Sequence, residues 1–177
     1  MVGRKVLLRV DKGPARPGAP VLEVESLVVR DAAGVTRVKG ISFEVRAGEI
    51  VGIAGVAGNG QSELLEALAG IRPIAGGRIS IKGRPVGAVA HARTRGLGHV
   101  PEDRLRMGLV PDFAAYENAI LGYQLDPDYS RHGFLDKLGI IGTCLRWMRG
   151  YDVRPGDALL KARSFSGGNQ QKLVLAR

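Results

Sequence analysis

A chain of 177 residues with 45% hydrophobic residues is long enough for one folded domain and too apolar to be intrinsically disordered. Its formal net charge of +9 comes from scattered lysines and arginines, so a drift in composition explains the charge better than a dedicated polyanion surface does. No stretch reaches the about 20 apolar residues that cross a bilayer, and charges interrupt the apolar runs that a signal peptide would need. The single cysteine, Cys144, excludes an internal disulfide and fits a reducing compartment.

Two strands joined by a turn are predicted near the start, after a short strand and a linker. Residues 5–10 are mostly apolar and predict a strand, whereas residues 11–20, with three prolines and two glycines, predict a semi-rigid linker. Residues 21–29 and 41–45 predict strands on either side of a turn at 31–34. A strand followed by a linker indicates the tail of a preceding domain.

The middle of the chain alternates strands and helices. Residues 50–54 form a continuous apolar run, as expected for a strand buried on both faces of a parallel sheet. A helix is predicted at 62–69, a strand at 78–82, a short helix at 90–94 and a strand at 96–100. These elements predict an α/β fold.

The last part of the chain is predicted to be mainly helical. Helices are expected over residues 116–123, 139–148 and 157–162, with polar loops between them. An α/β half is therefore followed by a helical insert, and a glycine turn closes the chain.

A glycine-rich loop follows the apolar run. Gly55 and Gly60 have the spacing of the phosphate loop G-x-x-x-x-G-K-[S/T], and Ser62 stands at its hydroxyl position, where it would bind Mg²⁺. Gln61 replaces the lysine, so we expect nucleotide affinity and catalysis at this loop to be reduced. Taken alone, the loop is equally consistent with a glycine turn whose only role is to pack a strand against a helix.

A second phosphate-binding pattern lies near the C-terminal end of the chain. Residues 165–172 read Phe-Ser-Gly-Gly-Asn-Gln-Gln-Lys and lead into a predicted amphipathic helix. Ser166 can cap this helix while its hydroxyl and the glycine N–H groups face an anion. The presence of both patterns in one chain argues against a plain packing role for either.

Together these motifs resemble the nucleotide-binding domain of an ATP-binding cassette (ABC) transporter, whose signature core is Leu-Ser-Gly-Gly-Gln. The resemblance covers residues 21–177. The Gly-Gly-Asn-Gln-Gln-Lys spelling is similar to the second cassette of double-cassette ATPases that drive bacterial uptake of simple sugars and nucleosides. Glu102 stands where most cassettes carry the glutamine of the Q-loop, which also fits that branch. Residues 132–135 and 151–154 resemble nucleoside-type importers more than ribose-type ones.

The resemblance implies two sites and two cofactors, ATP and Mg²⁺. The residues implied to bind nucleotide in the chain's own loop are Gly55, Gly58, Asn59, Gly60, Gln61, Ser62 and Glu63. The signature residues, implied to act in trans on the ATP of a partner domain, are Ser166, Gly167, Gly168, Asn169 and Gln170. Ser62 is the implied metal ligand, Glu102 is the Q-loop equivalent, and no base-stacking aromatic residue occurs in 30–37.

The resemblance also implies an arrangement of domains. Residues 1–20 would be the tail of a preceding cassette and a linker, 21–103 and 164–177 a partial ABC ATPase core, and 104–163 a helical subdomain. The implied fold is α/β: a P-loop NTPase core with an antiparallel β edge and a helical subdomain, truncated at its C-terminal end. In the family the catalytic glutamate and the switch histidine lie further along the chain, so we expect this chain alone not to hydrolyse ATP.

The implied function is that of the ATP-binding subunit of an ABC importer of a nucleoside or simple sugar, at the cytoplasmic face of the inner membrane. The expected partners are a first cassette of the same subunit or a second copy, membrane permease subunits, and, indirectly, a periplasmic or lipoprotein solute-binding protein. Nucleic acid is not expected. Two alternatives stay open: a soluble ABC-type ATPase acting on nucleic acid, which the charge of +9 would suit, and a non-catalytic nucleotide sensor, which the lysine-less loop would suit.

Overall fold

The computed structural model describes residues 13–177, apart from the side chains of residues 89–91. The predicted strand at 5–10 and the first two residues of the predicted linker lie outside the described residues. The linker continues over 13–18 without regular structure. The described chain forms two compact units, one ending at Leu97 and the other running from Gly98 to Arg177.

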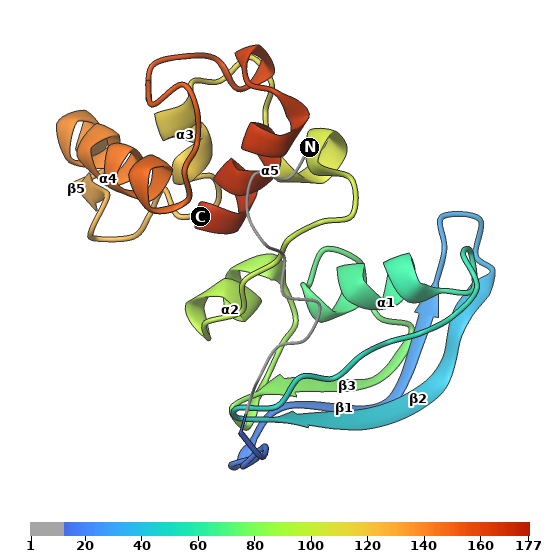
Figure 1. Cartoon of the computed structure of the whole chain (residues 1–177). Coiled ribbons are helices and arrows are strands. Elements are labelled where there is room, and N and C mark those ends of the chain that lie inside the picture. The colour runs from blue at the N-terminus through green and yellow to red at the C-terminus, as the bar shows by residue number, and fades with distance from the viewer. Residues whose placement is uncertain (1–12) are drawn as a thin grey trace. The chain divides into compact units, whose positions relative to one another are not determined.

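An antiparallel sheet with the strand order β2–β1–β3–β4 forms the frame of the first unit (Figure 1). Its two long strands confirm the strands predicted at 21–29 and 41–45, although β2 begins earlier than predicted, at Thr36. In the predicted turn between them the Gly34 N–H donates to the Asp31 carbonyl at 3.0 Å. The strand bounds are β1 Pro20–Arg30, β2 Thr36–Arg46, β3 Gly76–Ile81 and β4 Arg84–Pro85.

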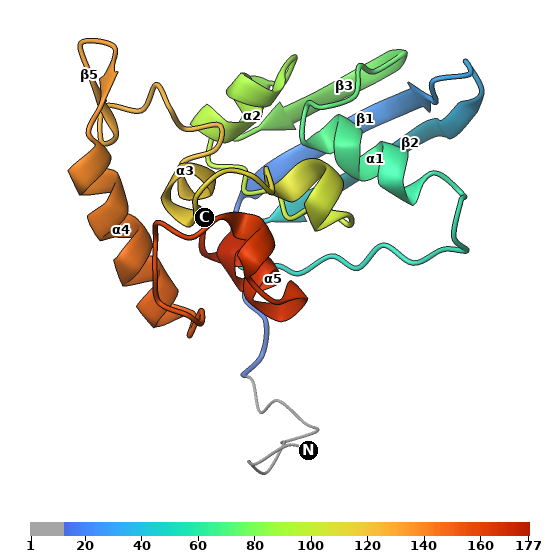
Figure 2. The same cartoon turned by 90° about the horizontal axis from the view of Figure 1, so that it is seen from above.

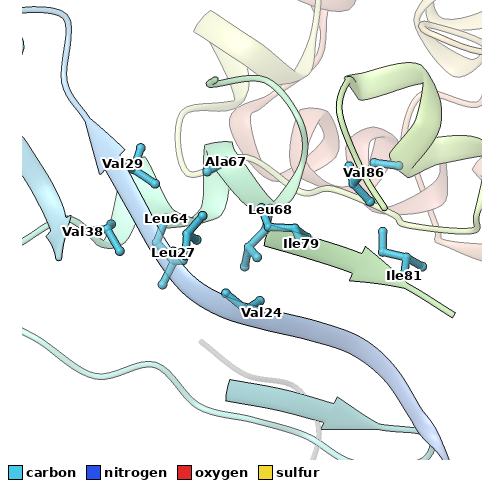
Figure 3. Packing of buried hydrophobic residues seen from close by; sticks show 11 residues of the cluster. Val24, Leu27, Val29, Val38, Leu64, Ala67, Leu68, Ile79, Ile81 and Val86 are labelled. Carbon is cyan, nitrogen blue, oxygen red and sulfur yellow. The ribbon is translucent and has the colours of Figure 1, made fainter. Parts of the chain in front are cut away.

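The core of the first unit lies between this sheet and α1 (Gln61–Leu68), as Figure 3 shows. A β-bulge at Ser26, whose φ is 45°, shifts the alternation of β1, so that Val24 and Leu27 both face the core. The predicted helix at 62–69 and strand at 78–82 are confirmed with slightly shifted ends. The buried core side chains are Val24, Leu27, Val29, Val38, Leu64, Ala67, Leu68, Ile79, Ile81, Val86 and Ala92.

Two predicted strands of the first half are wrong. Residues 50–54 have no regular structure and are exposed, with 93% of Ile50 accessible to solvent, and residues 97–100 have no regular structure either. Apolar content reflects a tendency to be buried, but a strand also needs a neighbour that pairs with its backbone. Among residues 13–177 no strand pairs with either segment. The short helix predicted between them is confirmed as α2 (Val89–Thr94).

Three helices pack together in the second unit (Figure 2). The buried face of the longest, α4, has a four-residue spacing at Ile140, Cys144 and Met148, which confirms the predicted helix there. The bounds of the regular elements are η1 Arg104–Gly108, α3 Ala115–Ala119, β5 Ser130–Arg131, β6 Phe134–Leu135, α4 Lys137–Gly150, η2 Ala162–Ser164 and α5 Gly167–Ala176.

The helix predicted at 157–162 is wrong, because this segment pairs with another part of the chain. The N–H groups of Ala115 and Tyr116 donate to the carbonyls of Leu160 and Ala158 at 2.9 and 3.0 Å, so these carbonyls are not available to a local helix. The helix predicted at 116–123 also ends early, at Ala119. The chain turns at Gly122, whose φ is 89°.

In the part of the chain that the structure describes, no helix combines the length and the apolar character needed to span a membrane.

Candidate functional site: a phosphate loop and a capped glycine turn

Residues 55–60 form a loop that passes twice through left-handed backbone. The φ angles of Gly58 and Gly60 are 88° and 99°. Gly60 also approaches β2 closely, since a Cβ at this position would lie 2.7 Å from the carbonyl oxygen of Arg37. Only glycine meets both conditions without strain. The curl of the loop therefore depends on these glycines.

Gln61, at the lysine position of the phosphate-loop motif, folds its side chain back onto the loop. Its Nε2 donates a hydrogen bond of 3.0 Å to the carbonyl oxygen of Val56. A Cβ at Gly55 would collide with that nitrogen, so Gly55 provides the space that the amide occupies. The amide is neutral, so it closes the loop without adding a positive charge.

A cavity of about 590 Å³ lies beside the loop, within the first unit. Strand β2 contributes two cations to its lining, Arg37 and Lys39. Both residues are exposed, and the Nε of Arg37 lies 2.7 Å from Oδ2 of Asp31. Neither phosphate-binding motif includes these two cations, because both lie on β2. In the sequence, only the alternation of β2 around buried Val38 points to them. The lining residues are Thr36, Arg37, Val38, Lys39, Ile41, Ile53, Ala54, Gly55, Gly58, Asn59, Gly60, Gln61 and Leu64.

The first turn of α1 faces this cavity without a side-chain cap. Gly60 is its N-cap residue, exposed Ser62 and half-buried Glu63 lie in its first turn, and the positive end of the helix dipole suits a phosphate. In residues 13–177 no group of three or more histidine, cysteine or acidic side chains could hold a metal by itself. Of the residues predicted to bind nucleotide, Ser62 and Glu63 are not among those that line the cavity.

Ser166 caps α5 in the second unit, as the sequence predicted. Its Oγ accepts hydrogen bonds from the backbone N and the Nδ2 of Asn169, at 3.5 and 3.0 Å. Ser166, Gly167 and Gly168 are exposed, and a Cβ on Gly168 would meet no atom within 4 Å. The turn thus presents its hydroxyl and its backbone to solvent.

A buried amide ties the same helix to the segment that follows Glu102. Gln170 is only 7% exposed; its Nε2 donates to the carbonyl of Ala162 at 3.1 Å, and its Oε1 accepts from Nε of Arg104 at 3.3 Å. A Cβ on Gly167 would lie 2.7 Å from Nη2 of Arg104, so the glycine makes room for the guanidinium. The sequence did not indicate this bridge, since its ends are 66 residues apart.

Glu102, the residue at the Q-loop position, is exposed and lies just before η1. Asp103 caps η1 by accepting hydrogen bonds from the N–H groups of Leu105 and Arg106, at 3.0 and 3.1 Å. Arg104, which donates to Gln170 in α5, is only two residues after Glu102 in the chain. The segment that follows Glu102 is therefore connected to the first turn of α5.

The loop after α4, at residues 152–154, is hydrogen-bonded to α5. Nζ of Lys172 donates to the carbonyl of Asp152 at 2.6 Å, and the Oδ1 of Asn169 accepts from the Arg154 N–H at 3.0 Å. A hydrogen bond from Arg154, the positive charge of that residue and that of Lys172 lower the pKa of Asp152 below its usual value. Asp152 therefore carries a negative charge at neutral pH.

A glycine loop that leads into a helix beside a cavity is the loop-to-helix part of the phosphate-loop motif, whereas the strand that precedes the loop in that motif is not formed by residues 50–54. Residues 38–177 match the model of the family described as ABC transporter. Because this match covers most of the chain, the chain belongs to the ABC transporter family.

Relatives along the whole chain are named as import proteins. The chain is 42% identical over 179 residues to the guanosine import ATP-binding protein NupO of Bacillus subtilis (strain 168). It is 41% identical to the nucleoside import ATP-binding protein NupA of Lactococcus lactis and 41% identical to the ribose import ATP-binding protein RbsA of Chromobacterium violaceum. Each match covers 100% of this chain but only 35%, 35% and 34% of the relative, so the chain spans about a third of their length.

Solved ABC cassettes share the fold. The dimeric post-hydrolysis state of the ATP-binding cassette MJ0796, bound to ADP and Pi, superposes with a TM-score of 0.71 at 20% identity, over 88% of this chain and 67% of that one. The cbiO1 protein of Clostridium perfringens gives a TM-score of 0.63 at 20% identity, over 89% of this chain and 60% of that one. The fold is therefore that of an ABC ATPase cassette, with an antiparallel sheet and a helical part.

Proposed function

We propose that the chain is part of the ATP-binding subunit of an ABC importer of a nucleoside or a simple sugar, and that it is the second of two cassettes in that subunit. The relatives named for guanosine, nucleoside and ribose import support this solute class. Glu102 at the Q-loop position and Asn169 in the signature support the position as second cassette, by the resemblance of these residues to that branch.

The observation that carries this proposal is the contrast between the two phosphate-binding elements of the chain. In the loop, Gln61 brings no charge to the phosphates and its amide is bound to Val56. In the signature, Ser166 caps the helix and stands exposed with Gly167 and Gly168. A chain that combines a weak loop with an intact signature fits a cassette that mainly serves the site of its partner.

In this function the two cassettes close around ATP that is held by the phosphate loop of the first. The hydroxyl of Ser166 and the exposed backbone N–H groups of the turn contribute to that ATP in trans. The chain's own loop binds nucleotide with Mg²⁺ at Ser62 but turns it over poorly. Closure is then a ligand-driven shift between open and closed states.

The remaining parts of the proposal follow from the same function. Residues 1–20 are the tail of the first cassette and a linker, 21–103 and 164–177 belong to the ATPase core, and 104–163 form the helical subdomain that contacts the permease. The subunit acts at the cytoplasmic face of the membrane and receives solute through a binding protein. The helices α3 and α4 of the second unit provide the surface for the permease.

A substitution at Gly168 tests the trans role in the intact subunit that contains this chain. Because a Cβ there meets no atom within 4 Å, Gly168→Tyr should fold normally and yet block the approach of a partner's phosphate. The matched control is Gly13→Tyr in the irregular segment of residues 13–18, where a Cβ also meets no atom within 4 Å. We expect ATP hydrolysis and solute uptake to fall about tenfold or more in the first variant only. Unchanged hydrolysis and uptake in Gly168→Tyr would show that the signature does not act in trans.

A further inference from the structure

The side-chain amide of Asn169 makes one hydrogen bond through its oxygen and another through its nitrogen. Its Oδ1 accepts a hydrogen bond from the backbone N–H of Arg154 at 3.0 Å, and its Nδ2 donates to Oγ of Ser166 at 3.0 Å. A backbone N–H can only donate, so it determines which end of the amide faces Arg154. The NH₂ group must therefore face Ser166.

This arrangement decides the direction of the Ser166 hydroxyl. A hydroxyl has two lone pairs and one proton. The Oγ of Ser166 accepts from Nδ2 of Asn169 at 3.0 Å and from the backbone N of Asn169 at 3.5 Å, so both bonds use lone pairs. Since Ser166 is exposed, its proton is left to an acceptor outside the turn.

Arg154, whose N–H donates to Asn169, lies in a loop that is hydrogen-bonded to two helices. Val153 is 3% exposed, and its N–H donates to the carbonyl of Met148 in α4 at 2.8 Å. The carbonyl of Asp152 accepts from Nζ of Lys172 in α5 at 2.6 Å. The N–H of Arg154 therefore comes from an anchored loop, and it holds the Asn169 amide in one orientation.

We propose that Asn169 is a positioning residue that makes the Ser166 hydroxyl a hydrogen-bond donor toward a phosphoryl oxygen at the N-terminal end of α5. This inference rests on the proposed function, in which the phosphoryl group belongs to ATP held by the partner cassette. The role of Asn169 is indirect. It acts through Ser166, and its orientation is set by the loop of residues 152–154.

A double-mutant cycle in the intact subunit tests this inference, with kcat for ATP hydrolysis as the readout. Asn169→Leu keeps the approximate size of the side chain and removes both hydrogen bonds. If Asn169 acts through the hydroxyl, Asn169→Leu should lower kcat about three- to tenfold in the wild-type background and less than about twofold once Ser166→Ala is present. Leu175→Gln, at an exposed position on the same helix outside the pattern of residues 165–172, is the matched control and should leave kcat unchanged.

Asn169→Asp provides a second variant that keeps the Arg154 bond. Its carboxylate can still accept from the Arg154 N–H, but the second oxygen accepts from Ser166 and turns the hydroxyl proton inward. We expect kcat to fall at least as far as in Asn169→Leu, with a smaller loss in the Ser166→Ala background, where only the added charge acts. If the Asn169 variants lowered kcat equally in the wild-type and Ser166→Ala backgrounds, or if Asn169→Asp kept the wild-type kcat, the positioning role of Asn169 would be overturned. The proposed function would still stand. A wild-type kcat in Ser166→Ala itself would overturn the proposed function as well.

Discussion

At the scale of single residues, Gln61 shows how one side chain changes the chemistry of a loop while leaving its backbone in place. The loop keeps its left-handed glycines, and the amide donates to the carbonyl of Val56 at 3.0 Å. What the amide lacks is charge. A charged donor to phosphate contributes more than a neutral one, by about 1 kcal/mol or more.

Gln61→Lys should therefore strengthen nucleotide binding by the chain. We expect the Kd for ATP with Mg²⁺ to fall by roughly tenfold, because about 1.4 kcal/mol corresponds to a factor of ten. Titration with a fluorescent ATP analogue measures this change. Gln171→Lys adds the same charge outside the loop and should leave the Kd near that of the unsubstituted chain. An equal gain in both variants would mean that net charge, and not the position of the lysine, controls binding.

At the scale of elements, the β1–β2 hairpin depends on a single carboxylate in its turn. Oδ1 of Asp31 accepts from the N–H groups of Ala33 and Val35 at 3.0 and 2.9 Å, and its Oδ2 accepts from Nε of Arg37 at 2.7 Å. The bond from Arg37, followed by the one from Val35, lowers the pKa of Asp31 below its usual 3.8. Because the folded pKa is the lower one, the stabilisation is complete above the unfolded pKa and is lost as pH falls through the folded one.

Asp31→Asn should consequently lower the stability of the first unit in a pH-dependent way. At about pH 7 the variant loses the charge that pairs with Arg37, and its urea midpoint should lie below that of the unsubstituted chain. The difference should shrink as pH falls below the ordinary aspartate pKa of 3.8, and it should be smallest below the lower folded pKa, where Asp31 is protonated and, like asparagine, neutral. Urea unfolding at a series of pH values measures it. A difference that does not change with pH would contradict the role of the carboxylate charge.

The attachment of α5 depends on the buried amide of Gln170. Gln170→Leu removes the acceptor for Arg104 and the donor for the carbonyl of Ala162, and we expect a loss of about 1–3 kcal/mol in the free energy of unfolding. Denaturant unfolding followed by circular dichroism measures it. Gln171→Leu on the same helix should change the free energy of unfolding by less than about 0.5 kcal/mol. Equal effects at both positions would show that the bridge does not stabilise the helix.

At the scale of the whole molecule, the apolar run of residues 50–56 is a surface feature. Ile50 is 93% exposed, Val56 73% and Ile53 46%. Exposed apolar stretches of this kind favour association, while the net charge of +9 opposes it through repulsion between copies. The balance between the two should depend on salt, because exposed charges are screened over about 10 Å at 0.1 M salt.

The double variant Ile50→Ser/Ile53→Ser should therefore associate less than the unsubstituted chain. We expect the unsubstituted chain to form larger species as salt is added, and the double variant to change its sedimentation much less. Leu125→Ser, which alters a residue that is 92% exposed outside the run, is the control and should behave like the unsubstituted chain. If the control and the double variant sediment alike, the run does not cause the association.

Local patterns in the sequence correctly predicted the elements whose structure depends on nearby residues. The hairpin β1–β2, the helices α1, α2 and α4 and the cap of α5 all follow from residues close together in the chain. The predictions failed where pairing with residues far along the chain determines the local structure. The carbonyls of Ala158 and Leu160 pair with residues 115–116, and the apolar run 50–54 finds no strand among residues 13–177.

The same division holds for the candidate site. The sequence by itself determined the glycine spacing, the uncharged Gln61 and the capping Ser166, because these depend on the identity and order of neighbouring residues. Only the tertiary structure decided that Lys39 lines the cavity, that Arg104 reaches Gln170 and that the Arg154 N–H orients Asn169. Such contacts arise when packing brings distant segments together, and hydrogen bonds between them depend on geometry that no local pattern records.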